Sequence, residues 1–131
     1  MAQFELKHIA EFRTRLKVYE LIRNGVNLID EFREEVLSDS NLAREWYVLV
    51  ASIEDVANGK MLPITRFRKL KLAKSVKPAL FEVKSKNLRL YLTFDYPHGQ
   101  ILIMGGKKVN QSRDIMKVTR LQREFHQYRK G

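Results

Sequence analysis

Residues 80–104 contain the pattern that decides the fold. Two stretches flank the short turn Ser85-Lys86-Asn87, namely Leu80-Phe81-Glu82-Val83-Lys84 and Leu88-Arg89-Leu90-Tyr91-Leu92-Thr93-Phe94-Asp95. In the second stretch apolar residues alternate with Arg89, Tyr91 and Thr93, and this period of two is typical of a β-strand. After a turn at 96–99 comes the apolar run Gln100-Ile101-Leu102-Ile103-Met104, which fits a central strand covered on both faces. The stretch therefore predicts a β-meander.

Other elements are expected on both sides of this meander. Before it we predict a strand at 4–8, a helix from Ile9 to Ile22 that ends at Asn24-Gly25, helices over 28–37 and 46–57, and a basic strand at 66–72. After it, Gly105-Gly106-Lys107-Lys108 is expected to leave the sheet, and Ser112 to cap a last helix that reaches Tyr128. Runs of helices followed by runs of strands indicate an α+β fold.

Length and composition indicate one domain without metal or cofactor. The chain has 131 residues and no cysteine, which excludes disulfides, thiol nucleophiles and cysteine-bound metal sites. The histidines, His8, His98 and His126, are scattered rather than paired at metal-binding spacing. No apolar run approaches the roughly 20 residues that a membrane span needs, and the stretch Met-Ala-Gln-Phe-Glu-Leu-Lys lacks the apolar core expected of a signal peptide. We expect a cytoplasmic protein, with residues 1–59 as strand and helices and 60–131 as basic sheet and C-terminal helix.

The charge of the chain is strongly asymmetric. The formal net charge is +10. Residues 1–59 hold seven Lys/Arg and eleven Asp/Glu, whereas residues 60–131 hold 18 Lys/Arg and four Asp/Glu, so the balances are −4 and +14. A half-chain this basic attracts polyanions through long-range electrostatics and counterion release. Nucleic acid is the favoured partner, an acidic protein is compatible with the same surface, and a solvated basic face is the plainer alternative.

A cluster of basic residues on the predicted hairpin is the candidate site. Arg89 lies in mid-strand, and Lys84, Lys86, Lys107 and Lys108 are expected near it, so that together they form a hollow able to grip a phosphodiester. Metal-free RNA cleavage needs little more, because the ribose 2′-OH is the nucleophile and the protein must orient it, take its proton and neutralise charge. The alternative for Arg89 is a salt bridge to Glu82 on the facing strand.

Further residues are candidates for supporting roles. Tyr91 either stacks on a base or packs in the core, and the basic strand offers RNA contacts through Arg68, Lys69 and Lys71. His126 is a possible acid/base, although a solvated histidine is the simpler reading. Gly105-Gly106 either forms a turn or lets the backbone approach a phosphate.

Residues 78–125 resemble the RelE/ParE superfamily of type II toxin–antitoxin toxins, in particular its phage-derived, HigB-like branch. The resemblance lies in the order of three stretches: Leu80–Tyr91 with its aromatic and arginine positions on either side of a short turn, then Phe94-Asp95, and then Ile101–Gln111 with Lys107-Lys108. Phe67-Arg68-Lys69-Leu70 is similar to a segment that precedes them in the family.

The resemblance implies a helical layer packed on a small twisted antiparallel sheet, here with an extended N-terminal helical part. It also implies a metal-free endoribonuclease that cleaves mRNA in the ribosomal A site and is neutralised by an acidic antitoxin, with which it forms a hetero-oligomer. By motif match Arg89 falls on the arginine that contacts the scissile phosphate, and Lys84, Lys107 and Lys108 fall on other basic positions of the site.

Two other functions stay open. A ParE-like protein would inhibit DNA gyrase without cleaving RNA, and a degenerate member would bind nucleic acid without activity. If Arg89 serves the phosphate, Arg89→Ala is expected to abolish toxicity and retain the fold.

Overall fold

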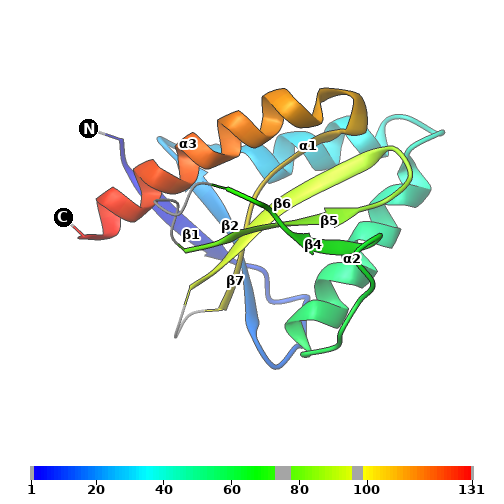
Figure 1. Cartoon of the computed structure of the whole chain (residues 1–131), viewed down its shortest axis with the longest axis horizontal. Coiled ribbons are helices and arrows are strands. Elements are labelled where there is room, and N and C mark those ends of the chain that lie inside the picture. The colour runs from blue at the N-terminus through cyan, green and yellow to red at the C-terminus, as the bar shows by residue number, and fades with distance from the viewer. Residues whose placement is uncertain (1, 73–77, 96–98, 131) are drawn as a thin grey trace.

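Three helices and seven strands form the part of the chain that the computed structural model describes, residues 2–72, 78–95 and 99–130 (Figure 1). In chain order they are β1 Phe4–His8, β2 Lys17–Arg23, β3 Val26–Asn27, α1 Leu28–Leu37, α2 Ala43–Ala57, β4 Phe67–Lys69, β5 Leu80–Lys84, β6 Leu88–Asp95, β7 Gly99–Lys107, the 3-10 turn η1 Lys108–Asn110, and α3 Gln111–Lys130. His98 and most of the predicted turn at 96–99 lie outside the described residues.

The strands form one mixed sheet in the order β1-β2-β7-β6-β5-β4, with β3 paired to the end of β2. The predicted meander is confirmed, because β4, β5, β6 and β7 pair antiparallel in sequence order. The expectation of a purely antiparallel sheet is wrong, because β2 pairs with β7 in parallel. The sheet thus joins residues 17–20 to residues 99–102 across most of the chain.

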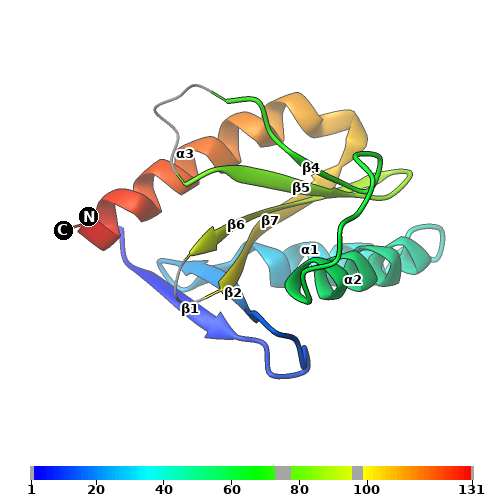
Figure 2. The same cartoon turned by 60° about the horizontal axis from the view of Figure 1, so that its bottom comes forward.

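Helices cover both faces of this sheet, with α1 and α2 on one side and α3 on the other (Figure 2). The first face buries Phe32, Trp46 and Leu49 against Leu90 and other sheet residues. The second face buries Val118 and Phe125 of α3 against a separate set that includes Tyr91. The apolar run of β7 supplies both cores, as predicted for a central strand covered on both faces. The predicted single helical layer is therefore corrected to two.

The predicted helix over 9–22 is wrong, because residues 17–23 form β2. Val18 and Glu20 of β2 face α1 and α2, whereas Leu21 faces α3. A strand covered on both faces has apolar residues on each, so it lacks the alternation that identifies a half-buried strand. Asn24-Gly25 then forms the two-residue hairpin turn between β2 and β3, with φ of 50° and 78°, instead of ending a helix.

The glycine pair at 105–106 belongs to β7, which continues to Lys107 instead of ending at Met104. Gly105 lies under the ring of Phe32 on α1, and Gly106 lies under the carboxylate of Asp114 on α3. A Cβ at either position would stand within 2.3 Å or less of these atoms. The two glycines therefore let both helices approach the same strand. No helix among the described residues is long and apolar enough to cross a membrane.

Candidate functional site

The predicted basic residues gather at the end of the sheet where the β5–β6 turn meets the end of β7. The backbone N–H of Lys108 donates to the carbonyl of Asn87 at 2.8 Å, which ties the turn to η1. Lys86, Lys107 and Lys108 are all exposed there. We call this region the hairpin end, defined by Lys84, Lys86, Arg89, Lys107 and Lys108.

The hairpin-end residues divide between the two faces of the sheet. Lys84 and Arg89 are cross-strand partners, so their side chains leave the sheet on the same face, toward α3. Lys107 pairs with Leu88 on the opposite face, and its Nζ lies 4.0 Å from a carboxylate oxygen of Glu35 on α1. The cations therefore lie close together around the end of the sheet but on both of its faces. The prediction of a single hollow across the strands is wrong.

Arg89 is buried, with 5% of its surface exposed. Its Nη1 donates to the carbonyls of Ser85 at 2.7 Å and Leu88 at 2.8 Å, which holds the β5–β6 turn. Its Nε is buried without a hydrogen-bond partner among the described residues. In this conformation the guanidinium binds backbone carbonyls and is closed to a ligand.

Glu82 is paired, but with residues other than Arg89. This fully buried carboxylate lies 2.6 Å from Nη2 of Arg68 on β4 and accepts from Nε2 of Gln111 on α3 at 2.8 Å. A buried carboxylate needs such partners because it has lost its hydration. Arg68, predicted as an RNA contact, thus joins β4 to β5, and Gln111 is a member of this network that sequence reasoning did not find.

Tyr91 and Asp114 complete the polar layer between the sheet and α3. Tyr91 is fully buried, so it takes the packing alternative and offers no face to a base. Burial raises the pKa of its hydroxyl, and the nearby carboxylates of Glu82 and Asp114 raise it further. Burial also raises the pKa of Asp114, against the opposing charges of Arg113 and Lys117. Asp114 lies over Gly106, the cross-strand partner of Arg89, and so helps to close this side of the hairpin end.

Of the remaining predicted cations, Lys69 and Lys71 are exposed and Lys84 is half-buried. Lys69 and Lys71 stand in the open at and beyond the edge strand β4, whereas Nζ of Lys84 donates to the carbonyl of Ile64 at 3.3 Å. Helix α3 adds a row of exposed cations along its outer face: Arg113, Lys117, Arg120 and Arg123. This row starts beside the hairpin end and extends the basic surface along the helix.

His126 lies far from the hairpin end. It lines a small pocket of about 180 Å³ with Thr93 and Asp95, at the other end of β6 from Arg89. Twelve residues of α3 separate His126 from Asp114, which corresponds to about 18 Å of helix. A ribose held at the hairpin end would therefore be out of its reach.

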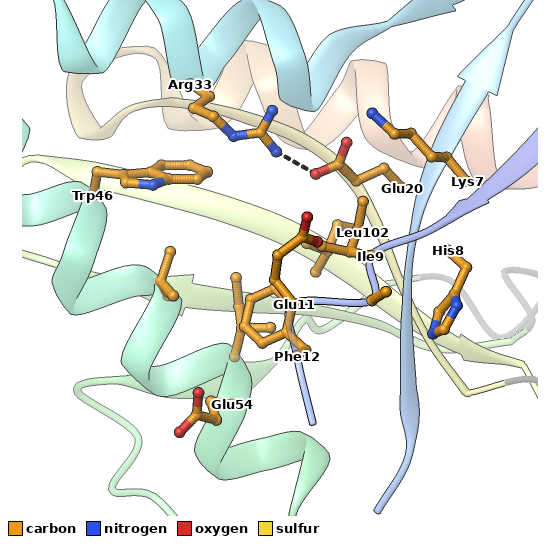
Figure 3. A pocket seen from close by; sticks show the side chains of 13 residues that line it. Lys7, His8, Ile9, Glu11, Phe12, Glu20, Arg33, Trp46, Glu54 and Leu102 are labelled. Carbon is orange, nitrogen blue, oxygen red and sulfur yellow. Dashed lines mark hydrogen bonds and ion pairs between the residues drawn. The ribbon is translucent and has the colours of Figure 1, made fainter. Parts of the chain in front are cut away.

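A separate pocket of about 450 Å³ lies between the segment 7–12 and helix α2 (Figure 3). Its polar wall is the buried Glu20, which accepts from Asn27 at 2.9 Å and pairs with Arg33. Arg33 also pairs with Asp30 and stacks over Trp46, with 5.3 Å from Cζ to the ring centroid. Arg33 thus compensates the charge of the buried Glu20, and Lys7, Glu11 and Glu54 also line the pocket. Sequence reasoning missed the pocket because it assigned residues 9–22 to a helix.

Among the described residues, no group of three or more His, Asp or Glu side chains is arranged to hold a metal ion. Comparison with protein-family models, with curated proteins and with solved structures finds no match to this chain.

Proposed function

We propose that this chain is a toxin of a type II toxin–antitoxin system, of the HigB-like branch of the RelE/ParE superfamily. It would act in the cytoplasm as a metal-free, ribosome-dependent mRNA endoribonuclease and be neutralised by an acidic antitoxin. The proposal starts from the ordered motifs in residues 67–111. It is supported by the antiparallel arrangement of β4–β7 followed by the helix α3.

The observation that carries the proposal is the concentration of cations at the hairpin end. Exposed Lys86, Lys107 and Lys108 lie on the turn and the strand end next to the buried Arg89, and the exposed arginines and lysine of α3 continue the surface. On a chain of net charge +10, this edge is suited to bind an RNA backbone. An acidic antitoxin would complement the same surface.

In the proposed reaction the ribose 2′-OH gives its proton to solvent water and its oxygen forms a bond to phosphorus, while the bond from phosphorus to the 5′-oxygen breaks and that oxygen takes a proton from water. The products are a 2′,3′-cyclic phosphate and a 5′-hydroxyl. Negative charge increases on the phosphoryl oxygens in the transition state, and positive groups at the hairpin end stabilise it. The exposed lysines act as point charges. Arg89 would reach a phosphate after its Nη1 releases the carbonyls of Ser85 and Leu88.

A second candidate is a nucleic-acid-binding protein that does not cleave its ligand. The burial of Arg89 and Tyr91 favours it, because both residues serve the fold in this conformation. The distance of His126 from the hairpin end favours it as well, since this histidine is too far away to accept the proton of a 2′-OH held there.

Controlled expression with mapping of mRNA 5′ ends tests the proposal. We expect codon-periodic cuts from the wild type. The double variant Lys107→Ala with Lys108→Ala should reduce the number of cuts by about tenfold or more. The matched control is Lys7→Ala with Lys17→Ala, two exposed lysines on β1 and β2. Growth arrest with intact mRNA and gyrase-dependent DNA breaks would establish the gyrase inhibitor instead. Harmless expression with RNA binding retained would establish the binding protein.

A further inference from the structure

The outward face of α2 is apolar in its middle. Trp46, Leu49 and Ile53 turn inward to the core. On the other side Tyr47 is 64% exposed and Val48 is 45% exposed, with Ala51 exposed one turn later. Residues at this spacing lie on one face of a helix. An amphipathic helix whose second face is also apolar has surface left for a partner.

The loop that follows α2 widens this apolar surface. Nη2 of Arg66 donates to Oγ of Ser52 at 2.7 Å, and Nζ of Lys60 lies 3.5 Å from Oδ1 of Asp55. These contacts hold the loop 60–66 alongside α2 (Figure 1). The loop exposes Met61 at 97% and Ile64 at 75%. We call Tyr47, Val48, Ala51, Met61 and Ile64 the α2 surface.

Two unpaired charges frame the α2 surface. Arg44 lies in the first turn of α2 and Glu54 in the last turn, and both are exposed without an ion pair among the described residues. A cation at the N-terminus of a helix and an anion at its C-terminus both oppose the helix dipole. In a lone chain these placements are unfavourable, so a compensating opposite charge from another molecule would explain them.

We propose that the α2 surface is the interface of a symmetric homodimer in which two α2 helices pack antiparallel. Arg44 and Glu54 are ten residues apart, about 15 Å along the helix. In an antiparallel pair, a twofold axis near the middle of α2 places Arg44 opposite the partner's Glu54, and the same pair forms again on the other side of the axis. Each charge then also lies near the favourable end of the partner helix dipole. Tyr47 and Val48 lose their exposure at the centre.

The charge distribution favours a second copy of the chain as the occupant. Residues 1–59, which include α2, have a balance of −4, whereas residues 60–131 have +14. Association through α2 brings together the less basic parts of two strongly basic molecules. The apolar centre with one cation and one anion at its ends is complementary to itself, as an isologous interface requires.

Charge reversal and its rescue test the dimer, with sedimentation velocity of the purified full chain from low micromolar to submillimolar concentration. We expect the wild type to sediment at twice the chain mass of 15.5 kDa. Arg44→Glu and Glu54→Arg should each weaken the dimer about tenfold or more, because each places like charges opposite one another twice. The double variant Arg44→Glu with Glu54→Arg restores both pairs with reversed sign and should restore the dimer.

The single reversals also separate interface loss from misfolding. Arg44→Glu places an anion near the N-terminus of α2, and Glu54→Arg places a cation near its C-terminus, and both charges interact favourably with the helix dipole. The thermal midpoint of the monomer should therefore stay the same or rise. Glu34→Arg on α1 and Arg123→Glu on α3 are matched controls at exposed positions, and they should leave the mass unchanged. A wild type that is monomeric at every concentration would overturn the proposal. The proposal would also be overturned if both single variants still sediment as dimers, or if the double variant does not restore the dimer.

Discussion

Arg89 shows how a functional expectation and a structural role can fall on the same side chain. From the sequence it is a cation in mid-strand, suited to a phosphate. In the fold it is buried and donates to the carbonyls of Ser85 and Leu88, which define the β5–β6 turn. Buried polar groups stabilise when they are paired and destabilise when a partner is lost. From the sequence, Arg89→Ala is expected to retain the fold, and the burial of Arg89 adds that the variant should be less stable.

We predict that Arg89→Ala lowers the free energy of unfolding by about 1–3 kcal/mol, because the partly buried carbonyl of Ser85 loses this donor and the carbonyl of Leu88 keeps only the backbone N–H of Ser85. Urea denaturation of the purified variant measures this. Arg13→Ala, at an exposed arginine, is the control and should change stability by less than about 0.5 kcal/mol. An Arg89→Ala protein as stable as the wild type would show that the turn does not depend on these bonds.

The glycine pair of β7 allows a prediction about which of two alanine substitutions lowers the stability more. A Cβ at Gly105 would lie 2.3 Å from Cδ2 of Phe32, a ring fixed in the core, whereas a Cβ at Gly106 would lie 2.0 Å from the terminal Oδ2 of Asp114, which can rotate away. We expect Gly105→Ala to cost about 1–3 kcal/mol of unfolding free energy and Gly106→Ala to cost less. Chemical denaturation of both variants decides, and the reverse order would contradict the packing of α1 on β7.

At the scale of elements, the N-terminus of α2 is fastened to the β5–β6 turn by one carboxylate. Glu45 accepts from Oγ of Ser85, from the backbone N–H of Asn87 at 2.7 Å and from Nδ2 of Asn87 at 2.8 Å. Burial raises the pKa of Glu45, but the hydrogen bonds from Ser85 and Asn87 together outweigh it, so the pKa is lowered. The charged form thus stabilises the contact between α2 and the hairpin end.

We predict that Glu45→Gln lowers stability at pH 7 by about 1–2 kcal/mol, since charge-assisted hydrogen bonds become neutral ones. A lowered carboxyl pKa gives stability that is present above the ordinary pKa and is lost as pH falls through the folded value. The difference in thermal midpoint between wild type and variant should therefore shrink below about pH 4.3. Glu34→Gln on α1 serves as control, and a gap that is independent of pH would refute the charge-based account.

At the scale of the whole molecule, charge is separated along the chain and then distributed over the surface by the fold. Helix α3 places exposed cations on one face of the sheet, the hairpin end adds cations around the sheet edge, and α1 contributes exposed carboxylates at Glu31, Glu34 and Glu35. Long-range attraction of a polyanion depends on this arrangement and is screened by salt.

We predict that single-stranded RNA binds this chain with strong salt dependence. Replacing Arg113, Lys117 and Arg120 of α3 together by alanine should reduce the slope of log K against log salt by about 2, at roughly 0.7 for each lost phosphate contact. Fluorescence anisotropy with a labelled oligonucleotide at several salt concentrations measures the slope. The triple variant Lys7→Ala, Arg13→Ala and Lys17→Ala removes the same charge elsewhere, and an equal loss of slope there would locate the binding surface outside α3.

The sequence by itself determined the meander and most of the helices. The helical spacing in α1, α2 and α3 reflects elements with one buried and one exposed face, and such elements carry their period in the order of their residues. Strand β6 keeps its alternation although both of its faces are buried, because Arg89, Tyr91 and Thr93 occupy the face under α3. The asymmetry of charge and the candidate cations could likewise be identified from the sequence, because they depend only on which residues occur and at which positions.

Tertiary structure decided what these residues do. The strand β2 is covered on both faces, so its sequence lost the alternation that marks a strand, and Asn24-Gly25 could equally end a helix or turn a hairpin. The burial of Arg89 and Tyr91, the pairing of Glu82 with Arg68 and Gln111, and the opposite facing of Lys107 all depend on where α1 and α3 pack. Local sequence holds the propensity of an element, whereas burial and pairing arise from contacts between residues distant in the chain.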